Sequence, residues 1–379
     1  MVCRLNYKTL LASGLLCALP TLAVTLNVQA AEQPDVLAQP SVITRQATHA
    51  VLLDITRVGQ RLVAVGERGV LLLSDDNGIS WRQVQMPVST TLTAVQFVDA
   101  RNGWVVGHSG VVLHSADAGQ TWQTWQLQLD GQRAAGLELA DAQRAAETTA
   151  SDDAQHRLAA AKRMVADGAD KPFLALNFSD AEHGMVVGAY GLAMHTEDGG
   201  KHWQSTMGQI SNAEGLHLYA LARSGATVYI AGERGLLLRS RDSGQPFERL
   251  NSPYDGSYFS LAVQADGALL VGGLRGNVFR SRDQGETFEG LVNPVPVSLG
   301  SAIDIGQRTL WVNQAGGLLF GTDDSPFLQP LVTPEGPPLT RVVGAADGSL
   351  IGVGFAGVLR LSMPAVNRES STSAQAALE

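Results

Sequence analysis

The chain has 379 residues, of which 45% are hydrophobic and 17% charged, and its formal net charge is −9. An acidic chain of this kind is a poor ligand for nucleic acids and for anionic lipid surfaces, because both carry negative charge. Its only cysteines, Cys3 and Cys17, are too few for a disulfide scaffold, and the length alone is typical of about two domains.

The first 30 residues have the pattern of a secretory signal peptide. Basic residues precede an apolar run from Leu10 to Leu26, and small residues before Ala31 offer a cleavage site. The run is too short for a permanent span, and Leu16 stands where a lipoprotein site before Cys17 needs a small residue. Cleavage after Ala30 removes both cysteines and two basic residues, so the net charge moves from −9 to −11. We therefore expect export to the periplasm, a position at the membrane periphery, no transmembrane segment and no thiol chemistry.

One phrase then repeats along the chain. It reads Gly-x-x-Gly, four mostly apolar residues, and Ser/Thr-x-Asp-x-Gly-x-x-Trp/Phe. The five clear copies are Gly66–Trp81, Gly107–Trp122, Gly188–Trp203, Gly232–Phe247 and Gly273–Phe288. Weaker copies keep the second glycine of the phrase, at Gly317 and Gly357. Counted at this second glycine (Gly69, Gly110, Gly191, Gly235 and Gly276 in the clear copies), successive copies lie 41, 81, 44, 41, 41 and 40 residues apart. A fixed period near 40 residues indicates one supersecondary unit repeated many times.

Each unit reads as four short strands. In the second unit the runs are Leu92–Val98, Gly103–Gly107, Val111–Ser115 and Thr121–Leu127, separated by clusters of turn residues. Four antiparallel strands at this period describe a propeller blade. The third strand is apolar at consecutive positions, which predicts a sheet buried on both faces. Seven units predict an all-β, seven-bladed β-propeller with four-stranded blades, over residues 31–364.

The two ends of the repeat array predict how the ring closes. The last unit stops after its third strand near Ser362, whereas Ser41–Ala47 precedes the first strand and has no partner there. We predict that residues 41–47 supply the outer strand of blade seven, which would remove an open sheet edge. Residues 365–379 are small and polar and are predicted to be disordered.

Residues 128–172 interrupt the repeat between units two and three. They contain no glycine pair and are rich in Ala, Leu, Glu, Gln and Arg, which favour helix. We predict an α-helical hairpin, with helices at about 134–149 and 152–166, the second capped by Ser151 or Asp152. Its apolar stripes, at Leu137 to Ala140 and Leu158 to Val165, could pack within the hairpin, on the propeller or on a partner. A chain without residues 130–170 is expected to keep its thermal transition.

The aspartate of each phrase lies in a tight turn between strands three and four. Such an aspartate accepts hydrogen bonds from amides of its own turn, and the aromatic residue after it can fill the gap between blades. One copy per blade favours a structural role, and the spacing lacks the further acidic ligands of a calcium loop. The residues are Asp76, Asp117, Asp198, Asp242 and Asp283, with Trp81, Trp122, Trp203, Phe247 and Phe288.

These phrases resemble a known family. SADAGQTW, TEDGGKHW and SRDQGETF look like the Asp boxes of BNR repeats. The longer phrases FVDARNGWVVGHSGVVLHSADAGQTW and FSDAEHGMVVGAYGLAMHTEDGGKHW resemble the photosystem II stability/assembly factor family of plants and cyanobacteria, and its bacterial relatives. The likeness covers about residues 50–362 apart from the insertion. It implies a non-enzymatic propeller without cofactor or metal, a monomer that binds membrane-protein subunits during assembly.

The Gly-x-x-Gly turns are the predicted partner-binding site. Their third residue is Arg68, Arg234 or Arg275 in units one, four and five, as in the family's Gly-x-Arg-Gly, and Tyr190 in unit three. Arginine can hold a carboxylate with two parallel hydrogen bonds, which suits an acidic segment of a partner. The alternative is that these arginines are merely solvated or paired with surface acids such as Glu67 and Glu233. A second, weaker candidate is the cluster Arg239, Arg241, Arg280 and Arg282.

A secreted glycan-processing or glycan-binding propeller is the alternative class. A sialidase-like site needs several arginines and a tyrosine–glutamate pair, yet Tyr229 reads as an ordinary strand residue and no Arg-Ile-Pro start is present. Paired carboxylates of another glycosidase remain open, because the acids of a propeller meet in space. His108, His114, His195 and His202 lack metal-ligand spacing. An assembly factor predicts solvent-exposed arginines on one face, whereas a glycosidase predicts an axial funnel with a carboxylate pair.

Overall fold

A computed structural model describes residues 35–122, 129–305, 308–331 and 336–361, all within one compact unit. The predicted signal peptide, the predicted disordered tail and most of the outer strand predicted at 121–127 lie outside these residues. The described residues form seven antiparallel sheets, and within each sheet the strands pair in chain order. No helix in the described ranges has the length and apolarity that crossing a bilayer requires.

Equivalent strands recur in every sheet. The innermost strands are β1 (Leu52–Val58), β5 (Leu92–Phe97), β8 (Phe173–Phe178), β12 (Leu218–Ser224), β16 (Tyr258–Val263), β20 (Leu299–Asp304) and β24 (Leu339–Gly344). The second strands are β2 (Arg61–Gly66), β6 (Gly103–Gly107), β9 (Gly184–Gly188), β13 (Thr227–Gly232), β17 (Leu269–Gly273), β21 (Arg308–Asn313) and β25 (Leu350–Gly354). The third strands are β3 (Leu71–Ser74), β7 (Val112–Ser115), β10 (Ala193–Thr196), β14 (Leu237–Ser240), β18 (Val278–Ser281), β22 (Leu318–Thr322) and β26 (Gly357–Leu361). The outer strands are β4 (Arg82–Val84), β11 (Gln204–Ser205), β15 (Glu248–Arg249), β19 (Glu289–Leu291) and β23 (Gln329–Leu331).

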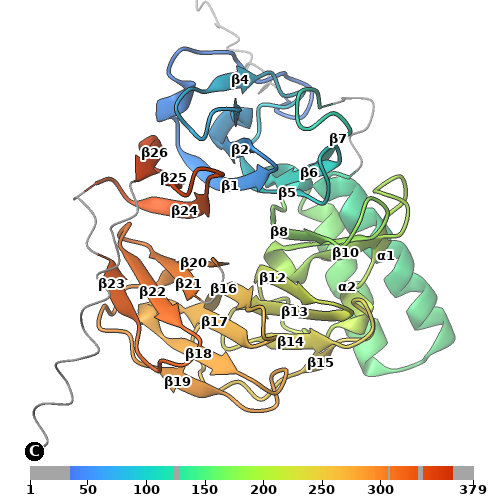
Figure 1. The fold of residues 1–379 in the computed structure, drawn as a ribbon. Helices are drawn as coiled ribbons and strands as arrows, with labels where there is room; N and C mark the ends of the chain where they lie inside the picture. The colour runs from blue at the N-terminus through green and yellow to red at the C-terminus, as the bar shows by residue number, and fades with distance from the viewer. Residues whose placement is uncertain (1–34, 123–128, 306–307, 332–335, 362–379) are drawn as a thin grey trace, which may run out of the picture. The chain divides into compact units, whose positions relative to one another are not determined.

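The sheets stand around a common axis (Figure 1). Each innermost strand contacts the innermost strand of the next sheet, and β24 contacts β1, so the ring is closed. This confirms the all-β, seven-bladed propeller. Five sheets have four strands, and those of blades two and seven have three within the described ranges. In blade two, Leu129 continues the missing edge through an antiparallel bridge to Val112.

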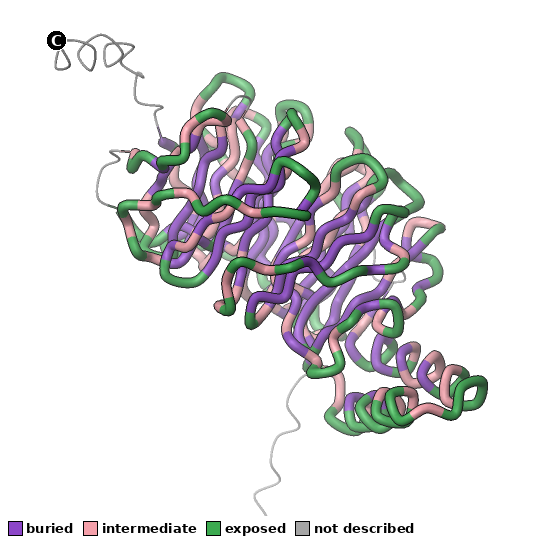
Figure 2. Tube along the Cα trace, turned by 90° about the horizontal axis from the view of Figure 1, so that it is seen from below, coloured by how far each residue is buried: buried purple, intermediate pink, exposed green. Residues whose placement is uncertain are grey.

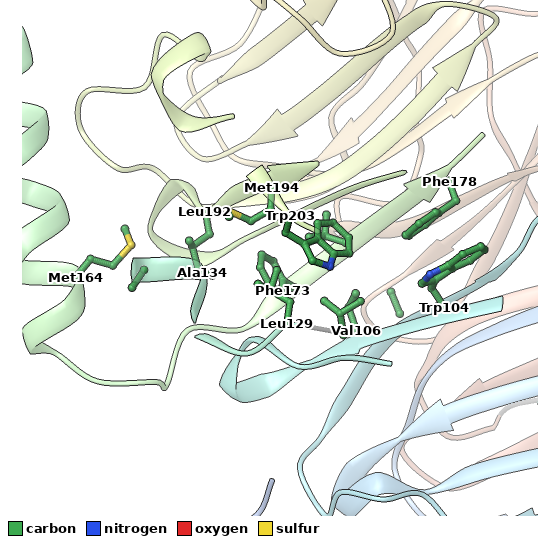
Figure 3. Close-up of a cluster of buried hydrophobic side chains, with 14 residues drawn as sticks. Trp104, Val106, Leu129, Ala134, Met164, Phe173, Phe178, Leu192, Met194 and Trp203 are labelled. Atoms are coloured by element: carbon green, nitrogen blue, oxygen red, sulfur yellow. The ribbon is translucent and has the colours of Figure 1, made fainter. Parts of the chain in front are cut away.

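The core lies between neighbouring sheets. The second strands β2 and β6 are buried almost along their full length, because each sheet is covered on both faces (Figure 2). Between blades two and three, Trp104 stacks on Phe178 with ring centroids 3.9 Å apart and donates from Nε1 to the Gly199 carbonyl at 3.3 Å. The same cluster continues through Trp203 to the helices of the insertion (Figure 3).

The closing strand predicted at Ser41–Ala47 is absent. Residues 41–44 form no strand, and the sheet β24–β25–β26 gains no outer strand from them. The segment instead lies along blade one: Ser41 N donates to the Met86 carbonyl at 2.9 Å, and Thr44 N donates to Oε1 of Gln83 at 2.8 Å. The backbone groups that were expected to pair with blade seven therefore make their hydrogen bonds to blade one. The segment reaches blade seven only through the 3-10 turn η1 (Ala47–His49), which contacts β26.

The ring closes through contacts that also join other blades. Thr340 Oγ1 donates to the Leu52 carbonyl at 2.9 Å, just as Thr93 Oγ1 of blade two donates to the Phe173 carbonyl of blade three at 2.6 Å. On the opposite face, Arg360 Nε donates to the Asn77 carbonyl at 3.2 Å. Blades seven and one thus meet as ordinary neighbours.

The insertion forms the predicted helical hairpin of α1 (Gly131–Thr148) and α2 (Asp152–Ala166). Asp130 caps α1 by accepting from Arg133 N, so this helix begins three residues earlier than expected, and Ser151 caps α2. The buried face of α1 consists of small residues, Ala134, Ala135 and Ala142, together with Glu138, and not of its leucines.

The hairpin packs on its own propeller. α1 contacts β11, and Ala134, Ala135 and Met164 share a core cluster with Trp203. This packing argues against the expectation that residues 130–170 can be removed without a change in thermal transition, because removal would expose the cluster to water. In Figures 1 and 2 the two helices lie at the outer edge of the ring.

Candidate functional site

The Gly-x-x-Gly turns are tight turns between strands two and three, and those of blades one, two, three and five are 3-10 turns. In η2 (Glu67–Gly69) the third residue of the phrase, Arg68, has φ 53° and Gly69 has φ +71°. A Cβ atom on Gly69 would lie 2.2 Å from the Val88 carbonyl oxygen, so only glycine fits there. Two successive left-handed residues therefore hold the side chain of the third position at the edge of the sheet.

The four predicted partner-binding residues occupy this one position and lie on one face. The turn follows β2 at the end where β1 begins, since Leu52 pairs with Gly66. Arg68 and Arg275 are exposed and have no ion-pair partner among the described residues. Arg234 pairs with Glu214 at 2.6 Å, although both side chains remain largely exposed, and Tyr190 is 51% exposed.

The insertion is rooted on the same face. Ala189 N, in the turn that carries Tyr190, donates to the Pro172 carbonyl at 3.0 Å, and Gly131 lies against Gly110 of the blade-two turn. The hairpin therefore leaves the ring between the turns of blades two and three.

The second arginine cluster is neutralised. Arg239 is buried and pairs with Glu248 at 2.6 Å and with Glu286 of blade five at 2.8 Å. Arg280 is also buried, pairs with Glu289 at 2.6 Å, and donates to the Asp323 carbonyl of blade six. These two side chains tie neighbouring blades together. Arg241 and Arg282 are exposed. Arg241 also pairs with Glu286, and Arg282 pairs with Asp266. Arg239 and Arg280 are therefore structural joints between blades.

The Asp boxes hold their own turns on the opposite face. Asp283 accepts from Thr287 N at 2.9 Å, Thr287 Oγ1 at 2.6 Å and Ser281 Oγ at 2.7 Å, and Asp76, Asp117 and Asp198 accept equivalent sets. The aromatic residues that follow pack between sheets: Trp122 meets Phe97 and Trp203 meets Phe178, both edge to face. Trp81, Phe247 and Phe288 belong to similar inter-blade clusters.

Blade four has a weaker Asp box. The residue four places after the aspartate is Ser80, Thr121, His202 or Thr287 in the other boxes, but Pro246 after Asp242. Proline has neither an amide hydrogen nor a hydroxyl. Accordingly, no donor among the described residues reaches the carboxylate of Asp242; its turn is held by Ser240 Oγ, which accepts from Gly244 N at 3.1 Å.

The Asp-box carboxylates make the folding stability depend on pH. Hydrogen bonds from the Thr287 side chain and amide, then from Ser281, lower the pKa of Asp283 from 3.8 to about 2. A carboxyl whose pKa is lower in the folded state stabilises the fold above pH 3.8, and this contribution is lost as pH falls through about 2. We expect Asp283→Asn to unfold more easily than wild type in urea at pH 7, with the difference shrinking at pH 2.5. Asp242→Asn is the matched control and is expected to cost less at pH 7. Equal losses for both variants would contradict the account.

The axial channel is lined by residues from all seven innermost strands and has a volume of about 320 Å³. Its aromatic members are Tyr219 and Phe259, with ring centroids 5.2 Å apart. Its one carboxylate among the described lining residues is Asp54, which accepts from Val95 N at 2.8 Å and lies 3.2 Å from Arg341 Nε. Burial raises the pKa of Asp54, while Arg341 and the amides of Val95 and Ile55 oppose that rise.

Three of the four histidines are engaged elsewhere, and His108 is exposed. His114 stacks on Trp104, and burial lowers its pKa; His195 Nδ1 lies 2.9 Å from Thr206 Oγ1; His202 belongs to the Asp box of blade three. Within the described ranges, no group of three or more potential ligands could hold a metal ion.

The sequence did not point to Tyr219, Phe259 or the Asp54–Arg341 pair. They lie on innermost strands outside the repeated phrase, and their neighbours come from other units: Phe259 is 40 residues from Tyr219, and Arg341 is 287 residues from Asp54. The signal that could have found Tyr219 and Phe259 is the residue after the first position of each innermost strand, which varies between units while the phrase does not. Asp54 and Arg341 stand one position later.

A closed ring of seven blades, five of them with an Asp box, and arginines and a tyrosine exposed around one end of a narrow channel define a BNR-type propeller with a candidate binding face. The family described as "Photosynthesis system II assembly factor YCF48" matches residues 73–147 and 155–308, which is more than half of the chain. The chain belongs to this family.

Individual relatives match in shorter stretches or in fold alone. The photosystem II assembly lipoprotein Ycf48 of Synechococcus sp. (strain CC9902) is 36% identical over 77 residues, which are 20% of this chain and 23% of the relative. The chain thus matches less than a quarter of the length of this curated relative. A solved structure described as YCF48 bound to D1 peptide superposes with a TM-score of 0.59 at 18% identity, over 86% of this chain and 97% of that one. An ancestral GH74 enzyme reaches 0.58 at 11% identity, over 85% of this chain and 46% of that one.

Proposed function

We propose that this protein is a non-enzymatic assembly or stability factor that binds segments of membrane-protein subunits on the face carrying Arg68, Arg234, Arg275 and Tyr190. The observation that carries the proposal is that Arg68 and Arg275 stand exposed on one face without an acidic partner among the described residues. Membership of the YCF48 family supports it, as does the D1 peptide bound to a protein of the same fold.

The chemistry of the face favours an acidic segment as ligand. A guanidinium group can hold a carboxylate with two parallel hydrogen bonds. The pairing of Arg234 with Glu214 is between two largely exposed side chains, and such pairs contribute roughly 0–1 kcal/mol. A carboxylate of the partner could therefore replace Glu214 at little cost. Loops and chain ends of a membrane-protein subunit are exposed during assembly, and such extended segments can contact this face.

The channel gives a hydrolase less support. Retaining and inverting glycosidases need two carboxyl groups roughly 5–10 Å apart. The described lining of the channel has one carboxylate, Asp54, and Arg341 and two backbone amides already hold it. The GH74 enzyme is similar in fold at 11% identity, and a likeness at this level gives no information about the functional site of this chain.

The proposed place of action is outside the cytoplasm, at the periphery of the membrane. The apolar segment before Ala31 supports export, and a relative of the same family is described as a lipoprotein. Fractionation of cells that express the tagged full chain tests this directly.

We expect the triple variant Arg68→Gln, Arg234→Gln, Arg275→Gln to lose cross-linked adducts to membrane proteins in intact cells by at least tenfold. Three desolvated arginine–carboxylate contacts account for several kcal/mol, and each 1.4 kcal/mol is a factor of ten. The adducts are identified by mass spectrometry after affinity purification of the tagged chain.

The matched control carries Arg57→Gln, Arg82→Gln and Arg101→Gln. These exposed arginines lie toward the Asp-box side of the ring, and their removal changes the net charge equally. Adducts that persist in the first variant, or fall equally in both, would count against the proposed face.

A further inference from the structure

Every innermost strand carries a β-bulge at its second residue. The register with the second strand shifts at the same point in all seven blades, between residues 52 and 54 in blade one and at equivalent positions in the others. A bulge leaves its extra residue unpaired and redirects its side chain. The seven residues, which we call the bulge ring, are Leu53, Thr93, Leu174, Tyr219, Phe259, Gly300 and Thr340, and all of them line the channel.

The bulge ring lies at the arginine face of the channel. The second residue of each innermost strand is next to the residue that pairs with the first glycine of the turn, as Tyr258 pairs with Gly273. The backbone of the ring repeats, whereas its side chains differ: blades four and five contribute aromatic residues, and blade six contributes Gly300. A repeated backbone that presents a variable residue at one site is the arrangement by which propellers adapt one fold to different ligands.

The aromatic side of the ring extends to the surface. Tyr190, on the exposed turn of blade three, lies 5.2 Å from the His217 ring; His217 stacks on Tyr219 at 6.1 Å; and Tyr219 lies 5.2 Å from Phe259. Glu233 orients Tyr219 by accepting from its hydroxyl at 3.2 Å. A continuous row of rings thus leads from the arginine face into the channel and ends at Phe259.

Open space follows Phe259. A Cβ atom on Gly300 would meet no heavy atom within 4 Å, and the residue is exposed in the channel. The backbone of Arg275 begins nearby, because its amide donates to Ser298 Oγ at 3.1 Å, two residues before Gly300, and the residue is exposed. An aromatic wall and an empty position thus lie between blades five and six, beside the turn that carries Arg275, whose guanidinium has no acidic partner among the described residues.

We propose that the bulge ring takes an aromatic side chain of an extended peptide, seated against Phe259 in the space over Gly300, while Arg275 binds a carboxylate next to that residue. The inference rests on the proposed function and names the chemistry of its ligand. A channel of about 320 Å³ is at the lower end of ligand pockets, so it suits one side chain and not a large ligand. The Asp54–Arg341 pair, on the innermost strands of blades one and seven, is already satisfied internally.

Filling the empty position tests the site without disturbing the fold. Gly300→Leu places a side chain where the structure has none, in a strand that tolerates side chains. The matched control is Gly344→Leu, whose Cβ also meets nothing within 4 Å, at the opposite end of the innermost strand of blade seven. The full chain is titrated with fluorescein-labelled decapeptides of glycine and serine and followed by fluorescence anisotropy. The first peptide carries phenylalanine followed by aspartate and has an amidated C-terminus. The second ends in phenylalanine with a free C-terminal carboxylate. In the control for each peptide, alanine replaces the phenylalanine.

We expect at least one phenylalanine peptide to bind wild type and Gly344→Leu about tenfold tighter than its alanine counterpart, and Gly300→Leu to abolish that difference. Phe259→Ala should weaken the same peptide about tenfold. The tighter of the two phenylalanine peptides identifies a side-chain or a terminal carboxylate as the natural group. Equal binding of phenylalanine and alanine peptides, or unchanged binding by Gly300→Leu, overturns the inference. If Arg275→Gln still reduces binding in that case, the proposed function stands without the aromatic site.

Discussion

Replacing Trp104 by alanine is expected to lower the free energy of unfolding by about 3–5 kcal/mol, the range for deleting a buried tryptophan. Trp104 is fully buried, stacks on Phe178 of blade three and on His114 of its own blade, and its indole N–H donates to the Gly199 carbonyl. The substitution therefore removes core packing, leaves a cavity and breaks a link between two blades. Urea unfolding followed by intrinsic fluorescence measures the loss.

Trp81→Ala provides the comparison. This tryptophan is only partly buried, in the Asp box of blade one, and its indole N–H donates within its own turn to Gly78. Its loss is expected to be clearly smaller than that of Trp104. If the two variants lose the same free energy, burial between blades is not what makes Trp104 important.

The second large effect is expected at Glu138, in the helical insertion. Its carboxylate is 2% exposed, pairs with Arg157 of α2 at 2.8 Å and accepts from Ser205 Oγ of the outer strand of blade three. It thus joins α1 to α2 and to the propeller at once. Removing one partner of a buried pair typically costs about 3–5 kcal/mol, and since Arg157 keeps Asp141 at 2.6 Å, we expect about 3 kcal/mol for Glu138→Ala. Urea unfolding gives this value, and limited proteolysis at residues 149–151 reports whether the hairpin loosens.

A rescue variant separates charge from packing. Glu138→Met combined with Arg157→Met removes both charges and keeps the volume, and such replacements of buried pairs are often neutral. We expect the double variant to recover most of the loss. Asp141→Ala, at a side chain that is 35% exposed, should cost about 1 kcal/mol or less. A double variant as unstable as Glu138→Ala would show that the carboxylate acts through something other than its pairing.

Several features of the fold follow from the order of residues along the chain. The blade number, the Asp-box turns and the two helices of the insertion are local or periodic. The left-handed position in the turn of blade one requires a glycine such as Gly69, and Ser151 caps the next helix through its own hydroxyl. Such signals need no knowledge of the neighbours of a residue in space. The repeat therefore predicted a seven-bladed propeller, and the composition of residues 128–172 predicted a helical hairpin.

Features between repeats required the tertiary structure. Ser41–Ala47 looked like a spare strand, but whether it pairs with blade seven or lies along blade one depends on which hydrogen-bonding groups are nearer after the ring closes. Arg239 and Arg280 looked like surface charges until their partners on the next blades were placed. The insertion looked separable because its anchor, Ser205, lies 67 residues from Glu138.

By itself, the sequence determined the modules and the face on which Arg68, Arg234 and Arg275 are displayed, because both depend on contacts within one repeat. Only the tertiary structure decided which of those arginines lack an acidic partner in the described residues, and that seven bulges bring Tyr219, Phe259 and Gly300 together around one axis. The physical reason is that burial and charge pairing are set by distances between blades, and closing the ring brings together residues that lie about 40 positions apart or more.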